Sequence, residues 1–182
     1  DIAASMLKTG SYEYALVIGS EKMSEIVNWK DRSVCVLFGD GAGAVVLKAV
    51  DNNTEDDTGV SAGHERGIID SNIYNDGTGA SVLTGGRRFS DSCSTDIFIH
   101  MDGQEVFKFA VKSVPTAIET LLHNNNMDVN DVDKFILHQA NVRIIESVAK
   151  RLKADKDKFP VNLNEYGNTS SASIPILLDE LN

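Results

Sequence analysis

The hydrophobic residues of this chain fall into short continuous runs and into longer stretches with helical spacing. Short continuous runs fit strands that are covered on both faces, and they are found at 14–19, 34–38, 44–47, 134–137 and 161–163. Further strands are predicted at 67–73 and 97–101. Apolar residues that recur every three or four positions predict helices over 103–126 and 141–152. This alternation of strands, loops and helices indicates an α/β layered fold with a largely parallel sheet.

Proline and glycine interrupt this pattern. Pro115 lies inside the predicted helix 103–126 and is expected to kink or split it. The sequence Gly-Asp-Gly-Ala-Gly at 39–43 joins two predicted strands, so it favours a tight turn over a dinucleotide-binding loop, which would need a helix after it. Asp40 is expected to accept hydrogen bonds from nearby backbone N–H groups. The polar stretch 75–94 is expected to be a long loop.

Composition narrows the class of protein. A chain of 182 residues with 42% hydrophobic residues can form a packed core and fits one domain or two small ones. No apolar run approaches the ~18 residues that a membrane span needs, and residues 1–10 lack the features of a secretory signal. The net charge of −10 argues against general nucleic-acid binding. We therefore expect a cytoplasmic protein with no membrane and no nucleic-acid partner.

The two cysteines, Cys35 and Cys93, have no spacing that suits a metal site, so we expect neither a metal nor a disulfide framework. Cys35 lies inside an apolar run, which predicts a small buried residue rather than a nucleophile. Cys93 lies in a polar stretch without an activating partner. Neither cysteine is therefore expected to be catalytic.

The two ends of the sequence look incomplete. Residues 1–8 resemble the end of an amphipathic helix that is closed by Gly10. The apolar segment 176–181 resembles a helix that stops abruptly at Asn182. We therefore expect a piece of a longer protein.

Two polar loops hold the most informative side chains. His138 follows the predicted strand 134–137, and Asn168 follows the predicted strand 161–163. In parallel α/β sheets, ligands bind beyond the carboxyl ends of the strands, where both residues would lie. A histidine ring N–H and an asparagine NH₂ group can donate to one substrate oxygen, which suits an enzyme that stabilises negative charge on a thioester carbonyl. No such setting surrounds the other histidines, His64, His100 and His123.

Three motifs carry a resemblance to a known family. They are Phe-Gly-Asp-Gly-Ala-Gly-Ala at 38–44, His-Gln-Ala-Asn at 138–141 and Tyr-Gly-Asn-Thr-Ser-Ser-Ala-Ser at 166–173. In this order they resemble the beta-ketoacyl-acyl carrier protein synthase III family, the condensing enzymes that start bacterial fatty-acid synthesis. The segment Gly-Gln-Glu-Val-Phe-Lys at 103–108 is also similar to the family. The resemblance covers nearly the whole chain.

The resemblance implies a thiolase-like fold, in which two similar α/β halves form a layered α-β-α-β-α sandwich. On this basis, residues 1–50 would end the first half, 51–58 would form an acidic linker, and 59–182 would make most of the second half. The nucleophilic cysteine and the final strands of the family would lie outside this chain, so the chain alone is expected to be inactive. The resemblance also implies a homodimer.

The implied reaction is a decarboxylative Claisen condensation of an acyl-coenzyme A primer with malonyl-acyl carrier protein. No cofactor is implied, because the coenzyme A thioester is a substrate. His138 and Asn168 would be the catalytic donors. Arg32 matches a family arginine that packs on the adenine of coenzyme A. Contacts to pantetheine and the acyl group are implied for Gly103, Gln104 and Phe107. The family pattern has asparagine where this chain has Gln104, so the resemblance is weaker at that position.

The resemblance also implies a docking surface for acyl carrier protein, which is acidic. The docking segment would consist of Gln139, Ala140, Asn141, Val142 and Arg143, with Arg143 as the main cation. Basic residues nearby would enlarge this surface, and they are Lys108, Lys150 and Arg151. Local positive charge would steer the encounter although the chain as a whole is negative.

Other functions stay open on the sequence alone. A polyketide synthase or a 3-hydroxy-3-methylglutaryl-coenzyme A synthase would share the fold. A non-catalytic fragment that binds carrier protein would share the docking surface. A cysteine-protease-like Cys/His/Asn triad is disfavoured, because neither cysteine lies at the start of a predicted helix.

Overall fold

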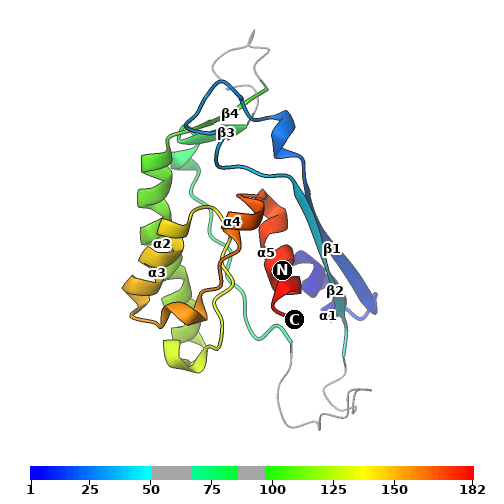
Figure 1. Cartoon of the computed structure of the whole chain (residues 1–182). Coiled ribbons are helices and arrows are strands. Elements are labelled where there is room, and N and C mark those ends of the chain that lie inside the picture. The colour runs from blue at the N-terminus through cyan, green and yellow to red at the C-terminus, as the bar shows by residue number, and fades with distance from the viewer. Residues whose placement is uncertain (51–66, 86–96) are drawn as a thin grey trace.

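Two long strands form an antiparallel pair on the right-hand side of Figure 1. The computed structural model describes residues 1–50, 67–85 and 97–182. Within these ranges, β1 (Tyr14–Glu21) pairs with β2 (Gly41–Lys48) along its whole length. None of the helices in these ranges is long and apolar enough to cross a lipid bilayer.

The C-terminal helices approach this strand pair closely because two strand positions lack a side chain. α5 (Ser173–Glu180) and the short helix η5 (Ser170–Ala172) contact the pair, in which Gly19 lies opposite Gly43. A Cβ atom at Gly19 would lie 2.6 Å from the carbonyl oxygen of Ser171. One at Gly43 would lie 3.0 Å from a backbone nitrogen of α5. These distances are too short for packed atoms, so glycine permits the contact.

A second, shorter strand pair leads into the longest helix. β3 (Leu83–Gly85) and β4 (Ile99–Met101) are antiparallel. Asp102 then caps α2 (Gly103–Asn124) by accepting hydrogen bonds from two N–H groups of its first turn. The remaining short helices are α1 (Ile2–Lys8), η1 (Met23–Glu25), η2 (Gly77–Gly79), η3 (Val129–Asp131), η4 (Lys156–Lys158) and α4 (Leu163–Tyr166).

The helix α2 continues through Pro115, so the predicted split does not occur. Proline has no N–H to donate to the carbonyl four residues earlier, which is that of Val111. Arg151 in α3 (Val142–Leu152) donates from Nη1 to this carbonyl oxygen at 3.4 Å. A side chain from the neighbouring helix therefore partly replaces the backbone bond that proline removes.

The main hydrophobic core lies between α2, α3 and the segments that flank α3. Ile145, Val148 and Leu152 are buried on one face of α3. They pack with Phe135 and Phe159, whose rings stack with centroids 4.7 Å apart. The apolar spacing in the sequence thus identifies the buried face of this helix correctly.

The helices predicted over 103–126 and 141–152 are confirmed as α2 and α3. The strands predicted at 14–19 and 44–47 are confirmed within β1 and β2. The strand predicted at 97–101 is shorter than expected and forms β4.

The predicted parallel sheet is wrong for the described residues. Both strand pairs there are antiparallel, and the only parallel pairing is a single bridge between Phe38 and Asn168. Residues 34–37 form turns, in which Val34 N donates to the carbonyl oxygen of Asp31, and Phe38 forms only the bridge. A run of apolar residues indicates that a segment is buried, but it does not show that another strand lies beside it to pair with. No strand is found at the other such runs, which are 67–73, 134–137 and 161–163.

The glycine-rich segment 39–43 is not a tight turn between two strands, because residues 34–37 directly before it form turns and β2 begins at Gly41. Asp40 does accept hydrogen bonds, although its donors are the backbone nitrogen and hydroxyl of the more distant Ser24. The polar stretch 75–94 is not only loop, since η2 and β3 lie within it. The predicted linker 51–58 lies outside the described residues.

The core predicts the effect of a large-to-small substitution. Leu152→Ala should lower the free energy of unfolding by about 2–5 kcal/mol, because it removes buried methyl groups and leaves a cavity. Urea denaturation would measure the change, with Glu119→Ala on the exposed face of α2 as the control. Equal stability of the two variants would contradict the assignment of this core.

Candidate functional site

His138 and Asn168 line the same cavity, which has a volume of about 1010 Å³. The walls of the cavity come from the end of β1, from β3 and β4, from one face of α2 and from the start of α3. Apolar atoms make up most of the lining. The structure therefore brings together the two side chains that the sequence selects, on one concave surface.

Asn168 is held in place by backbone contacts between two of the sequence motifs. Its N–H donates to the carbonyl oxygen of Leu37 at 2.9 Å, and its own carbonyl oxygen accepts from Gly39 N at 3.0 Å. A Cβ atom at Gly39 would lie 2.0 Å from the carbonyl oxygen of Tyr166. Glycine at this position is thus what allows the two motifs to meet, and Gly167 supplies the left-handed φ of 67° that turns the chain into Asn168.

The orientation of the Asn168 side chain follows from its hydrogen bonds. Asn168 Oδ1 accepts from the backbone nitrogen of Ser170 at 2.9 Å. This bond assigns the other end of the amide to the NH₂ group. Within the described ranges, Asn168 Nδ2 has no hydrogen-bond partner although the residue is buried. Since Asn168 lines the cavity, this donor is available to a ligand there.

The His138 ring is held through one of its two nitrogens. Nδ1 lies 2.6 Å from the hydroxyl oxygen of Ser173, whereas Nε2 has no hydrogen-bond partner among the residues that the structure describes. The residue is exposed on the side of the open cavity, yet the protein atoms around the ring displace water. This desolvation lowers the pKa of His138 below its ordinary value of 6.5. The ring is therefore neutral near pH 7.

Gln139, the residue after His138, has a structural role that differs from the docking role predicted from the sequence. Its side chain is fully buried, so the prediction that it contacts a carrier protein is wrong. Gln139 Nε2 donates to the carbonyl oxygen of Leu137 at 2.9 Å, and Oε1 accepts from Asn162 N at 3.2 Å. The buried amide thus joins the His138 loop to the segment that leads into Asn168. Residue spacing gives no signal for such a contact.

Glu21 is a second residue that the sequence did not single out. It lines the cavity from the end of β1 and accepts hydrogen bonds from the hydroxyl and the backbone nitrogen of Ser171. The Ser171 hydroxyl lowers the pKa of the Glu21 carboxyl, which stays ionised at neutral pH. A fixed negative charge therefore lies at one edge of the cavity.

The predicted substrate-binding residues divide into two groups. Gly103 and Phe107 line the cavity. Gln104 is exposed and does not line it, while Arg32 is exposed on the turn before Val34. The first group is placed for contact with a molecule inside the cavity. The second could contact only a molecule that extends beyond it.

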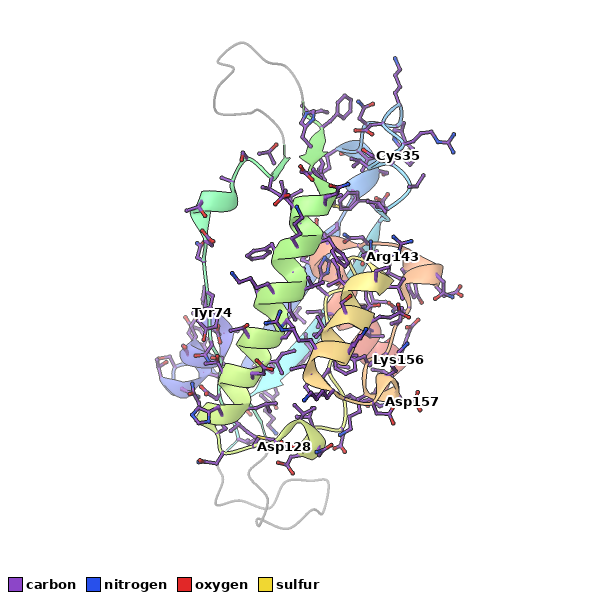
Figure 2. All side chains as sticks on the ribbon, turned by 90° about the vertical axis from the view of Figure 1, so that its left-hand side faces the viewer. Cys35, Tyr74, Asp128, Arg143, Lys156 and Asp157 are labelled. Carbon is purple, nitrogen blue, oxygen red and sulfur yellow. The ribbon has the colours of Figure 1, made fainter. Side chains whose placement is uncertain are left out.

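The predicted docking segment is only partly at the surface. Ala140 and Asn141 line the cavity, and Asn141 Oδ1 caps α3 by accepting from the backbone nitrogen of Arg143. Val142 and Arg143 are exposed, and Figure 2 shows Arg143 at the start of α3. Of the cations expected nearby, Lys108 forms an ion pair with Glu105 at 2.6 Å, Lys150 is exposed and Arg151 reaches α2.

Cys35 lies away from the cavity. It is half-buried in a turn rather than in a strand, so the strand-based reason given for its burial is wrong. Among the described residues, no cysteine lines the cavity, and Cys93 and His64 lie outside the described ranges. The described side chains also form no cluster of three or more metal-ligand groups.

Comparison with known proteins shows which family the chain resembles. The family description 3-oxoacyl-[acyl-carrier-protein] synthase III matches residues 1–77, and its C-terminal counterpart matches residues 122–182. The chain is 42% identical to a beta-ketoacyl-[acyl-carrier-protein] synthase III of Clostridium acetobutylicum, over 99% of this chain and 53% of that protein. It is 47% identical to the corresponding protein of Ehrlichia chaffeensis, over 97% of this chain and 52% of the other.

Solved structures give the same result. The crystal structure of 3-oxoacyl-[acyl-carrier-protein] synthase III from Aquifex aeolicus aligns with a TM-score of 0.83 and 43% identity, over 99% of this chain and 52% of that chain. The priming beta-ketosynthase of the R1128 polyketide pathway aligns with a TM-score of 0.77 and 33% identity, over 99% and 52%. The chain spans about half the length of these relatives. It belongs to the 3-oxoacyl-[acyl-carrier-protein] synthase III family and has part of its thiolase-like α/β fold.

Proposed function

We propose that this chain supplies the His/Asn half of the active site of an acyltransferase that initiates type II fatty-acid synthesis. The reaction is the decarboxylative condensation of an acyl-coenzyme A primer with malonyl-acyl carrier protein. The observation that carries this proposal is that His138 and Asn168 line one cavity, and that His138 Nε2 and Asn168 Nδ2 have no hydrogen-bond partner among the described residues. The names of the relatives support it.

Decarboxylation of a malonyl thioester places negative charge on the thioester oxygen. N–H groups that point at this oxygen stabilise the enolate, and one such donor contributes about 3 kcal/mol in a site that excludes water. Asn168 can donate without any change of protonation, because its orientation is fixed by the bond from Ser170. His138 donates to the same oxygen when Nε2 carries a proton.

The nucleophile comes from another part of the full-length protein. A cysteine there attacks the acyl-coenzyme A thioester and holds the acyl group until the enolate attacks it. Cys35 is not suited to this role, because it does not line the cavity and is held in a turn. No cofactor enters the reaction, since every bond change uses the two thioesters and the thiol.

The substrates approach the cavity from its rim. Gly103 and Phe107 line the part that receives the pantetheine arm and the acyl group. Arg32 is exposed, so its planar guanidinium is free to pack on the adenine of coenzyme A. Gln104 is exposed at the first turn of α2 and contacts the pantetheine arm only near the entrance.

The carrier protein docks beside α3, where Arg143 and Lys150 present positive charge to an acidic partner. The full-length protein is a cytoplasmic homodimer on this proposal. Residues 1–50 complete one thiolase-like half, 51–58 form a linker, and 59–182 make most of the second half. The first family description continues through the proposed linker to residue 77, and the second matches residues 122–182.

Replacement of Asn168 tests the central claim. In the full-length protein, Asn168→Ala should lower the rate of malonyl decarboxylation by about 10²–10³-fold, because one donor to the enolate is lost. Acyl transfer onto the nucleophile, followed by mass spectrometry, should be retained. Normal condensation by this variant would exclude the proposed role.

The ionisation of His138 can be measured directly. Desolvation lowers the pKa of His138, so its ring signals should titrate with a midpoint below the ordinary 6.5 in an NMR pH titration. The unfolded chain takes up the proton at higher pH than the folded one, so this residue destabilises the fold as the pH falls from 6.5 toward the lowered value. A midpoint above 6.5 would contradict the neutral ring.

The docking surface predicts a charge-dependent affinity. Arg143→Ala should weaken the binding of acyl carrier protein by about two- to fivefold, as expected for one exposed ion pair. Added salt should weaken binding of the unaltered protein as well. Lys153→Gln, at the far end of α3, is the matched control and should bind normally. An equal effect of both substitutions would place the carrier protein elsewhere.

A further inference from the structure

Ser173 contacts His138 at the nitrogen that is not available to a ligand. The serine is only 2% exposed, at the first position of α5, and it does not line the cavity. Its hydroxyl oxygen lies 2.6 Å from His138 Nδ1, 3.3 Å from Gln139 N and 2.9 Å from the carbonyl oxygen of Ser170. One buried hydroxyl therefore has three polar neighbours.

The hydrogens of these contacts can be assigned by counting donors. A serine hydroxyl has one hydrogen to donate and two lone pairs that accept. The N–H of Gln139 donates to Oγ, which uses one lone pair. The Ser170 carbonyl oxygen can only accept, so its contact with Oγ is a hydrogen bond only when the hydroxyl hydrogen points toward it. The 2.6 Å contact with His138 must then use a hydrogen on Nδ1.

The opposite arrangement satisfies fewer groups. If the hydroxyl donated to Nδ1, the Ser170 carbonyl oxygen would face a lone pair of Oγ across 2.9 Å. Two acceptors at that distance in a buried place repel each other, and the carbonyl would keep only its bond from the backbone N–H of Ser173. The arrangement in which Nδ1 donates makes all three contacts favourable. It is also the usual local bond of a serine to a carbonyl three residues earlier in a helical turn.

We propose that Ser173 is a positioning residue that keeps the proton of neutral His138 on Nδ1 and leaves Nε2 as a proton acceptor facing the cavity. This proposal deepens the proposed function and rests on it for its catalytic meaning. Other titratable side chains line the same cavity, and none of them hydrogen-bonds to the ring within the described segments. They are Glu21, Asp76, Glu105, Lys108 and Lys112.

The assignment gives His138 two successive roles. During acyl transfer, Nε2 accepts the proton of the attacking thiol as its S–H bond breaks, and the ring becomes an imidazolium with a hydrogen on each nitrogen. The proton then moves from Nε2 to the sulfur of coenzyme A as the thioester C–S bond breaks, so the ring is neutral again. Ser173 Oγ accepts from Nδ1 in both states, so the ring does not move. Condensation consumes one further proton, because the cysteine sulfur leaves the acyl group as a thiolate. A proton that Nε2 takes up from water supplies the N–H donor for the thioester oxygen when its negative charge develops, and it then returns the cysteine to its thiol form.

The tautomer can be read without substrate or turnover. In the full-length protein labelled with [¹⁵N]histidine, the nitrogen shifts of neutral His138 distinguish a ring protonated on Nδ1 from one protonated on Nε2, and His138→Ala assigns the signals. We expect Nδ1–H in the unaltered protein. In Ser173→Ala the acceptor is gone, so Nε2–H should become the main form. Nε2–H in the unaltered protein, or an unchanged tautomer in Ser173→Ala, would overturn the proposal.

A second measurement separates positioning from a general loss of structure. The hydrogen bond from Nδ1 to Ser173 is stronger when the ring is charged, so Ser173→Ala should lower the pKa of His138 further, by up to about one pH unit.

Ser171→Ala removes a neighbouring hydroxyl that bonds to Glu21 and not to His138, so it is the matched control and should leave tautomer and titration unchanged. Ser173→Cys keeps a weak acceptor of similar size and should restore part of the Nδ1–H form. A titration of Ser173→Ala equal to that of the unaltered protein would also exclude the proposal. Because neither measurement needs condensation, inactivity of the full-length protein would count against the proposed function alone.

Discussion

The two backbone hydrogen bonds that join Asn168 to residues 37 and 39 are the constraint on which the site depends. They form only because Gly39 has no side chain, since a Cβ atom there would lie 2.0 Å from the carbonyl oxygen of Tyr166. A substitution at Gly39 would push the two motifs apart and move the Asn168 amide with them. The glycine-rich motif near residue 40 therefore contributes to the chemistry by packing, without contacting a ligand itself.

The buried amide of Gln139 extends this constraint to the other donor. It connects the segment around Leu137 with the backbone of Asn162, which lies six residues before Asn168. Loss of this amide would leave a buried N–H and a buried C=O without partners, each at a cost of about 1–3 kcal/mol. The two loops consequently behave as one unit, and a shift of one would be transmitted to the other.

The sequence predicts the chemistry of the site better than the sheet around it. His138, Asn168 and the buried face of α3 follow from local order and spacing, and the structure places the first two in one cavity. The run at 34–38 is as apolar as a strand but forms turns, because strand pairing depends on a neighbour that the run itself does not encode. The same limit applies to the buried role of Gln139, which needs Asn162 beside it in space.

The continuity of α2 shows a similar dependence on distant partners. Pro115 removes a backbone hydrogen bond to the carbonyl of Val111, and the long contact from Arg151 in α3 partly replaces it. Arg151 and Arg143 are both exposed, but only Arg151 of the two reaches α2 in this way. Arg143 at the start of α3 is therefore the stronger candidate for docking.

The side chains of Asn168 and His138 are oriented by bonds that lie within the chain. Asn168 Oδ1 is fixed by Ser170 two residues later, and His138 is fixed by Ser173 at the start of α5. An amide and a ring that are already aligned need no reorganisation when charge develops, which is where hydrogen-bond donors gain most of their effect. Since η5 and α5 are anchored by the close contact at Gly19, the alignment of both donors derives from the packing of the C-terminal helices on β1 and β2. The geometry of the His138 and Asn168 side chains is therefore a consequence of the hydrophobic and glycine-mediated packing, and it should persist as long as that packing does.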